Sequence, residues 1–394
     1  MPLAGRRWNV SQESKLLLAL LRQEIAGVPG EIPGAIDWNA FIELAAFHSL
    51  EALAYSGLQR FAEVPKAVLT QLEGAYHCAI FRDTQFGFIR AELTKALTDE
   101  CVPHIFLKGS CLKQDYPVPA LRTMSDIDVL IRVEDFQKID RAAAKLFGKR
   151  KDGDGNHRNF LFPGNVMVEF HPNLLHHGTP VGTGINPGWQ YALEGSSNGE
   201  RFLSEEGFYL SILCHLANHF VYGGVGVRFV LDVWVCRHLR KAQPDRYFVE
   251  QELERFGLLE FTQKIEALSE VWFGNDEMSP ELEELGEYIL TSGTHGNVER
   301  AMLNAVSLAP GGSAAAALWK KMFYPRQELE DRYPWCRGKT WLLPAAWCTR
   351  AFQAVTRRGN MILNWQKGVG AVSKETAAAQ REKLKRFGIN QTNQ

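Results

Sequence analysis

Hydrophobic residues recur every three or four positions through the first hundred residues, and this spacing predicts amphipathic helices. The stretch SKLLLALLRQEIAG follows it and ends at Gly27. Asp37 is suited to cap a second helix, and Pro65 suits the first turn of a third that extends to Leu97, with or without a break. We therefore expect a helical region over residues 1–99.

The period changes after residue 100, where short apolar runs bounded by Gly and Pro predict strands. VPHIFLKG predicts one strand and SDIDVLIRV a second, and EDFQKIDRAAAKLFG predicts an amphipathic helix. KRKDGDGNHRN predicts a polar connection, and NFLF, a Pro-Gly turn and NVMVEFH predict a hairpin. Residues 179–200 are rich in Gly, Pro, Ser and Asn, so we expect a loop or a domain boundary there.

Helical patterns return after Glu200. SEEGFYLSILCHLANHFVYGG and VRFVLDVWVCRHLR are apolar on nearly every side, which predicts buried helices. WLLPAAWCTRAFQAVTRRGNMILNWQKG predicts a helix interrupted at Pro344, and the last dozen residues are polar enough to suit disorder. The expected organisation is helical over 1–99, a mixed core over 100–195, helical over 196–340 and a basic helical tail over 341–394.

The composition is ordinary for a globular protein, with 45% hydrophobic and 23% charged residues. The formal net charge of -1 gives no general basic character of the kind that favours nucleic acid. The charge is uneven, however, because residues 337–394 hold eleven Lys or Arg against two Glu, which leaves -10 for the remaining residues. This tail is either a solvated helical end or a surface that meets a polyanion or an anionic membrane.

Cysteine usage and hydropathy bear on location. The seven cysteines are scattered with no CxxC pair, which is typical of reduced thiols. No apolar run approaches the roughly 18 residues of a membrane span, and the apolar part of the N-terminus is too short for a signal peptide. We therefore expect a cytoplasmic protein.

Candidate chemistry gathers in the predicted core. Asp126 and Asp128 stand two apart in an apolar run, so a strand projects both from one face. Adjacent carboxylates repel, and burying them is costly unless a cation such as Mg2+ or Mn2+ joins them. Glu169 falls on the polar face of a strand that can pair beside the first, and three such acids can hold two metal ions. Gly109 and Ser110 follow a strand and suit a phosphate cradle.

This order of elements resembles the polymerase-beta nucleotidyltransferase superfamily, and more narrowly a bacterial family of uncharacterised nucleotidyltransferases. The matching stretches are FLKGS (106–110), Tyr116-Pro117, LRTMSDIDVLI (121–131) and VEFHPNL (168–174), with the helices on either side. The resemblance implies an α/β (α+β) fold, a small mixed sheet flanked by helical regions. Fifteen residues separate Ser110 from Asp126, which is longer than the usual spacing.

The resemblance also implies transfer of a nucleoside monophosphate from an NTP to a hydroxyl acceptor, with release of pyrophosphate. It gives Asp126, Asp128 and Glu169 the role of holding Mg2+ or Mn2+, and Glu169 a part in deprotonating the acceptor. Gly109 and Ser110 would hold the β- and γ-phosphates of the donor, for which ATP is the first candidate. The acceptor stays open between a small molecule, a peptide and RNA, and the oligomeric state is open too.

Three neighbouring side chains have both a functional and a structural interpretation. Lys108 and Arg122 are the cations nearest the acids and can neutralise triphosphate charge. The alternatives are an exposed strand end for Lys108 and a structural ion pair for Arg122. His171 shares the face of Glu169, as a partner of a metal ligand or as an acceptor contact.

Two further pairs stand four residues apart on predicted helices. His215 and His219 lack the glutamate of a zinc HExxH motif, so we expect core packing, or contact with the base or acceptor, rather than zinc. Arg228 and Asp232 predict a buried ion pair that fixes the helix, or residues that line the cleft.

Two other function classes fit the same fold. A non-catalytic nucleotide-binding or interaction module has no need for three facing carboxylates. A metal-dependent phosphohydrolase favours histidines mixed with the acids, and only His171 is placed for that in the sequence.

Overall fold

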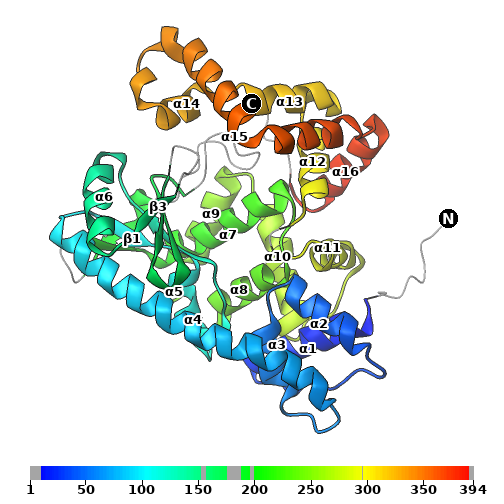
Figure 1. The fold of residues 1–394 in the computed structure, drawn as a ribbon. Coiled ribbons are helices and arrows are strands. Elements are labelled where there is room, and N and C mark those ends of the chain that lie inside the picture. The colour runs from blue at the N-terminus through cyan, green and yellow to red at the C-terminus, as the bar shows by residue number, and fades with distance from the viewer. Residues whose placement is uncertain (1–9, 152–156, 175–187, 196–198, 295, 390–394) are drawn as a thin grey trace.

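The computed structural model describes residues 10–151, 157–174, 188–195, 199–294 and 296–389. Four helices come first: α1 (Gln12–Ala26), α2 (Trp38–Phe47), α3 (Glu51–Leu58) and α4 (Lys66–Asp99). α4 runs for 34 residues without a break, from the N-terminal helices to the sheet (Figure 1). This one helix therefore connects the N-terminal region to the core.

A seven-stranded mixed sheet has the strand order β3-β4-β5-β2-β1-β7-β6. Its strands are β1 (His104–Phe106), β2 (Asp126–Leu130), β3 (Lys149–Lys151), β4 (Arg158–Phe162), β5 (Val166–His171), β6 (Ala192–Glu194) and β7 (Glu200–Leu203). β2 pairs in parallel with β5 and antiparallel with β1, and β4 and β5 form the predicted hairpin. The expected mixed α/β fold with flanking helices is confirmed.

Three strands lie where the sequence predicted connections. β3 uses three charged residues of the expected polar connection, and the start of β4 is also inside it. β6 and β7 lie within or beside the expected loop, of which residues 179–187 and 196–198 are outside the described part. These strands are short and mostly polar or half-exposed, so their pairing partners, rather than an apolar pattern, hold them in the sheet.

One face of the sheet is apolar and the other carries the candidate acids. Ile127 and Val129 of β2 and Val168 of β5 are fully buried in a cluster with Phe86 of α4 and Ile139 of α6 (Phe136–Lys145). Because side chains alternate along a strand, this packing directs the intervening side chains of β2 and β5 to the opposite face. The hydrophobic face thus fixes where the acids point.

The C-terminal half is helical. Its helices are α7 (Glu205–Tyr222), α8 (Val227–His238), α9 (Arg246–Arg255), α10 (Leu259–Phe273), α11 (Pro280–Leu290), α12 (Val298–Ser307), α13 (Ala314–Met322), α14 (Arg326–Arg332), α15 (Leu343–Gly370) and α16 (Lys374–Arg386). The short helices are α5 (Gly109–Leu112), η1 (Lys113–Asp115), η2 (Pro119–Leu121), η3 (Val133–Asp135), η4 (Pro163–Asn165), η5 (Trp189–Tyr191), η6 (Pro310–Gly312), η7 (Pro334–Cys336) and η8 (Thr340–Leu342).

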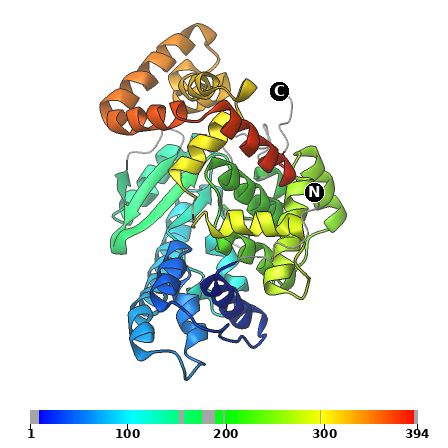
Figure 2. The same cartoon turned by 90° about the vertical axis from the view of Figure 1, so that its right-hand side faces the viewer.

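The two helical regions share a core. Leu17 of α1, Leu58 of α3, Leu213 of α7 and Phe261 of α10 are fully buried in one apolar cluster. α13, α14 and α15 form a layer at one end of the molecule, and the N-terminal helices lie at the other (Figures 1 and 2). No described helix is both long and apolar enough to cross a membrane.

Two expectations for the tail are wrong. Pro344 lies in the first turn of α15, where its missing N–H costs nothing, so it starts the helix instead of interrupting it. The last dozen residues are not simply a polar end, because α16 extends to Arg386 and buries Phe387 and Ile389. Residues 390–394 lie outside the described part.

Candidate active site

The pairing of β2 with β5 sets the geometry of the acids. Asp128 lies directly opposite Glu169, and Asp126 lies opposite Met167. Paired residues on neighbouring strands start about 4.8 Å apart, whereas residues two apart on one strand start about 6.6 Å apart. The backbone therefore brings Asp128 closer to Glu169, which is 41 positions further along the chain, than to Asp126 on the same strand.

Asp128 is the most enclosed of these acids, and two cationic or donor groups contact it. Lys108 Nζ lies 3.1 Å from Asp128 Oδ2, and His171 Nε2 lies 2.8 Å from Asp128 Oδ1. Burial opposes ionisation, but the charge of Lys108 and the hydrogen bond with His171 hold the pKa of Asp128 well below its usual range. Asp128 is thus a buried carboxylate anion at the centre of the site.

The pKa values of the other two carboxyl groups, Asp126 and Glu169, are shifted in the opposite direction. Burial and the charge of Asp128 raise the pKa of Asp126. Burial also raises the pKa of Glu169, and the neighbouring Asp126 and Asp128 add to this while His171 opposes it. Three acids on one face therefore repel one another, and a divalent cation between them would remove that cost.

The donor atoms that converge most closely come from Asp128, Glu169 and His171, one atom of each lying within 4.8 Å of the others. His171 Nε2 also lies 3.5 Å from Glu169 Oε2. Two carboxylates and an imidazole form a set that fits a divalent metal ion such as Mn2+, and carboxylate oxygens alone suit Mg2+. Asp126 is outside this closest group, because the register pairs it with Met167, two residue pairs away from Glu169.

Lys108 lies between β1 and α5, and Gly109 and Ser110 are the first two residues of α5. Lys108 takes a left-handed φ of 47°, which is uncommon for a residue with a side chain. Ser110 is buried, and its hydroxyl donates to the Leu107 carbonyl at 2.9 Å. A Cβ atom at Gly109 would collide with the guanidinium of Arg122. The serine hydroxyl is therefore used within the turn, and the glycine makes room for an arginine.

Arg122 is held by α8. Its Nε and Nη2 donate to the two carboxylate oxygens of Asp232 at 3.0 and 2.6 Å, and Tyr116 Oη donates to the same carboxylate at 2.6 Å. Among the described residues, Asp232 therefore pairs with Arg122, and the expected pair of Asp232 with Arg228 is not formed. The helical spacing of Arg228 and Asp232 was correct, but Arg122 offers two parallel hydrogen bonds from another element.

The sequence match now has a structural context. The model of a family described as "Uncharacterised nucleotidyltransferase" matches residues 34–274. The chain belongs to this family. The match includes α2 to α10, all seven strands and every candidate site residue discussed here. No curated protein and no solved structure shows significant similarity to the chain.

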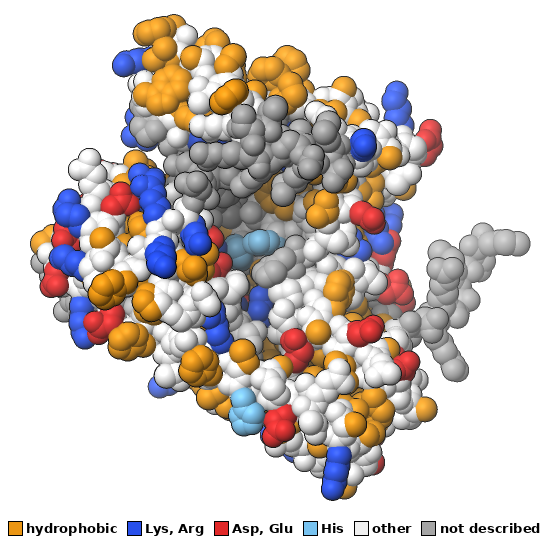
Figure 3. All heavy atoms as spheres, in the orientation of Figure 1, with side chains coloured by type: hydrophobic (Ala, Val, Ile, Leu, Met, Phe, Trp, Pro, Cys, Tyr) orange, Lys and Arg blue, Asp and Glu red, His pale blue; other side chains and the backbone are white. Residues whose placement is uncertain are grey.

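In this nucleotidyltransferase family member, α7 brings two histidines toward the acids. The rings of His215 and His219 meet edge to face at 4.3 Å between centroids, and both lie close to Phe229. Burial and the charge of Lys108 lower the pKa of His215 well below its usual value, so this ring is neutral. Figure 3 shows histidine side chains in a hollow between the sheet and the C-terminal helices. His215 also interacts electrostatically with Asp128, so it lies on the same side of the sheet as the acids.

Two polar residues beside the acids were not predicted as part of the site. The ring of His157 lies 4.6 Å from that of His171, and Asn159 of β4 lies opposite Glu169. Asn159 is the first residue of the predicted strand NFLF, and His157 lies two residues before it. Extending the hairpin register backward by two residues from Asn159 would have placed His157 opposite His171, on the acidic face.

Proposed function

We propose that this chain transfers a nucleoside monophosphate from an NTP to a hydroxyl acceptor in a metal-dependent reaction. The observation that carries the proposal is the pairing of Asp128 with Glu169 on parallel strands, with Asp126 two residues earlier, in a member of a nucleotidyltransferase family. Such a face of acids is costly without a cation and is suited to a polyphosphate substrate.

The proposed reaction forms one bond and breaks one. The acceptor oxygen attacks the α-phosphorus, and the bond from that phosphorus to the oxygen bridging to the β-phosphate breaks. The electron pair leaves with pyrophosphate, and the acceptor proton passes to a base. Glu169 is the proposed base, because its carboxylate lies opposite Asp128 and is the more exposed of the two, 30% against 12%, so an acceptor hydroxyl can reach it.

The residues around the acids have proposed parts in binding. Asp128, Glu169 and His171, with Asp126 beside them, would hold the divalent cation. When bound, that cation supplies charge neutralisation and polarises phosphoryl oxygens. Lys108 is the proposed contact for a triphosphate oxygen, because its ammonium group already lies beside Asp128. Gly109 and Ser110 would contribute through backbone amides, since the Ser110 hydroxyl is bonded to Leu107.

Arg122 is left out of the proposed phosphate contacts. Its charge is matched by Asp232 in a buried bidentate pair, so it positions the segment that leads into β2. ATP is the proposed donor. A cytoplasmic location is also proposed, because reduced thiols and NTPs are both expected there.

A metal-dependent phosphohydrolase is the second candidate, and one observation favours it. His171 contacts both Asp128 and Glu169, and the ring of His157 lies next to it, so histidines are mixed with the acids after all. Water instead of an acceptor hydroxyl would then attack, and the products would be those of hydrolysis.

Calorimetric titration of each NTP with Mg2+ or Mn2+, comparing the wild type with the D126N/D128N variant, tests the proposal. We expect metal-dependent binding of one NTP that the double variant loses. An NTP labelled at the α-phosphate then separates the two candidates. Label transferred to an acceptor with pyrophosphate release supports the transferase, and ADP with inorganic phosphate supports the hydrolase. Binding of no NTP by a folded wild type would refute the proposal.

A further inference from the structure

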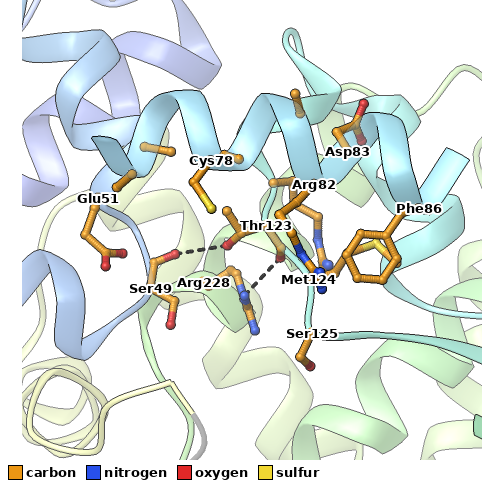
Figure 4. Close-up of a pocket in the computed structure, with 15 residues that line it drawn as sticks. Ser49, Glu51, Cys78, Arg82, Asp83, Phe86, Thr123, Met124, Ser125 and Arg228 are labelled. Atoms are coloured by element: carbon orange, nitrogen blue, oxygen red, sulfur yellow. Dashed lines mark hydrogen bonds between the residues drawn. The ribbon is translucent and has the colours of Figure 1, made fainter. Parts of the chain in front are cut away.

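A cavity of about 330 Å³ opens beside the acids, between α3, α4, α8 and the segment that enters β2 (Figure 4). Thr123, Met124 and Ser125 form one wall, and the next residue in the chain is Asp126. Arg82 and Cys78 reach it from α4. Along the chain, the cavity wall therefore ends one residue before Asp126, which stands beside the proposed metal ligands.

The charged groups of the cavity wall do not cancel. Arg122 is matched by Asp232, and Asp83 is matched by Lys113 Nζ at 2.5 Å. The remaining charged lining groups are Arg82 and Arg228 against Glu51. The cavity thus has an excess of positive charge, although the whole chain has a net charge of -1.

Arg228 is held in place but incompletely satisfied. Its Nη1 donates to the Thr123 carbonyl at 3.0 Å, and its Nε is buried with no hydrogen-bond acceptor among the described residues. Burial and the nearby charge of Arg122 lower the pKa of Arg228. A buried guanidinium with an unmet donor is costly, and an anionic ligand would satisfy both the donor and the charge.

Arg82 is similarly fixed without a counter-charge. Its Nη1 donates to the Gly164 carbonyl at 2.9 Å, and its guanidinium lies over the Phe86 ring at 4.7 Å. Neither partner carries a charge. The rest of the wall is made of small and apolar side chains such as Ala52, Ala79 and Met124. Two positioned arginines beside an apolar wall suit a small molecule with one anionic end.

We infer that this cavity is the acceptor subsite, and that the acceptor is a small molecule whose carboxylate or phosphate group binds Arg228 and Arg82 while its hydroxyl points toward Asp126. This inference rests on the proposed function. The volume is near the lower end of the roughly 300–1,000 Å³ of ligand pockets. A cavity of this size holds a small molecule, whereas an RNA end or a complete NTP needs more room.

The exposed thiol of Cys78 allows the charge preference to be measured without knowing the acceptor. The other two exposed thiols, Cys101 and Cys348, are first replaced by serine. Two methanethiosulfonates of similar size are compared, one with a sulfonate and one with a trimethylammonium group. In both, the Cys78 thiolate attacks the sulfenyl sulfur, a disulfide forms and methanesulfinate leaves.

The measured quantity is the rate of the anionic reagent divided by the rate of the cationic reagent. At low ionic strength we expect this ratio to be about tenfold higher at Cys78 than at a free thiol, which is the lower end of the range for electrostatic steering. Arg228→Gln and, separately, Arg82→Gln should each remove most of this preference. Lys95→Gln, on the same helix but exposed and paired with Glu92, is the matched control and should leave it unchanged. A rate ratio at Cys78 equal to that of a free thiol, or the same ratio in all variants, overturns the inference.

Competition separates the two anion sources. Protection of Cys78 by inorganic phosphate but not by acetate indicates an acceptor phosphate, and the reverse indicates a carboxylate. Protection by neither anion, when each is present in large excess over the reagent, counts against the subsite.

NTP titration distinguishes the acceptor subsite from the donor site. After Cys78 is modified, the wild-type affinity for NTP should change by less than about twofold. A lost NTP affinity means that the cavity belongs to the donor and overturns the acceptor assignment. If unmodified protein binds no NTP while Cys78 still prefers the anionic reagent, the proposed function fails and the anion site stands by itself.

Discussion

Arg122 and Asp232 form a bidentate ion pair that ties the segment before β2 to α8, with both side chains more than nine-tenths buried. Tyr116 donates a third hydrogen bond to the same carboxylate. The pair lies beside both the Gly109 segment and the cavity, because the Arg122 guanidinium approaches Gly109 and also lines the cavity. It therefore fixes the position of both.

Asp232→Asn should destabilise the fold strongly. The variant leaves the Arg122 charge buried without its partner, and breaking such a pair costs about 3–5 kcal/mol. Urea denaturation measures this as a lower midpoint. Glu284→Gln removes the charge of a half-buried surface carboxylate that pairs with the exposed Arg386, and should cost less than about 1 kcal/mol. If the two variants lose the same stability, the buried pair does not hold the segment.

The register predicts an order among the acids. Asp128 shares the closest group of donor atoms with Glu169 and His171, whereas Asp126 lies beside it. We expect Asp128→Asn to lower Mn2+ affinity about 100-fold and Asp126→Asn about tenfold, within the range for changes in and around a metal site. Calorimetry with Mn2+ measures both, and Asp276→Asn in an exposed loop is the control. Equal losses, or a larger loss for Asp126→Asn, would contradict the geometry.

The face of the sheet on which the acids lie could be predicted, because side chains alternate between the two faces along a strand. The alternation in SDIDVLI and NVMVEFH placed Asp126, Asp128 and Glu169 on polar faces, and the pairing of β2 with β5 is the one expected. The number and exact register of the cross-strand contacts could not be predicted, because neither segment alone shows which acid lies opposite which residue.

The contacts of the arginines were less predictable for a different reason. Arg122 and Asp232 are 110 positions apart, and local spacing suggested Arg228 as the partner instead. Short polar strands such as β3 were missed because their stability comes from neighbours in the sheet. The tail was misjudged because its composition is basic, while a few apolar residues near its end decide that it packs.

Phe387→Ala should show that the basic tail is part of the core. Phe387 is 1% exposed, and its ring lies 5.8 Å from Phe220 and 5.4 Å from Tyr288. Removing a buried Phe costs about 3–5 kcal/mol. Phe88→Ala, at a ring that is 65% exposed on α4, should stay within about 0.5 kcal/mol. Thermal and urea unfolding compare the two, and an unchanged stability of Phe387→Ala would mean that this end is detached.

His48 should make the fold sensitive to acid. The ring is fully buried, its Nε2 lies 3.1 Å from the Leu290 carbonyl, and its Nδ1 accepts from the Val227 amide. Burial lowers the pKa of His48 to about 4, from an ordinary value of about 6.5. The unfolded chain therefore binds the proton more tightly, so stability is fully present above about pH 6.5 and falls as the pH drops toward 4.

Between pH 7 and pH 5 this group should remove about 2 kcal/mol of unfolding free energy, since each pH unit over which only the unfolded state is protonated costs about 1.4 kcal/mol. Urea midpoints at both pH values measure the loss.

His104 and His215 also have lowered pKa values, so the wild type should lose more than His48 alone explains. His48→Gln should lose less unfolding free energy between pH 7 and pH 5 than the wild type, and the difference is the contribution of His48. His77→Gln changes an exposed ring and should lose as much as the wild type. Parallel pH profiles for all three proteins would show that His48 does not couple protonation to folding.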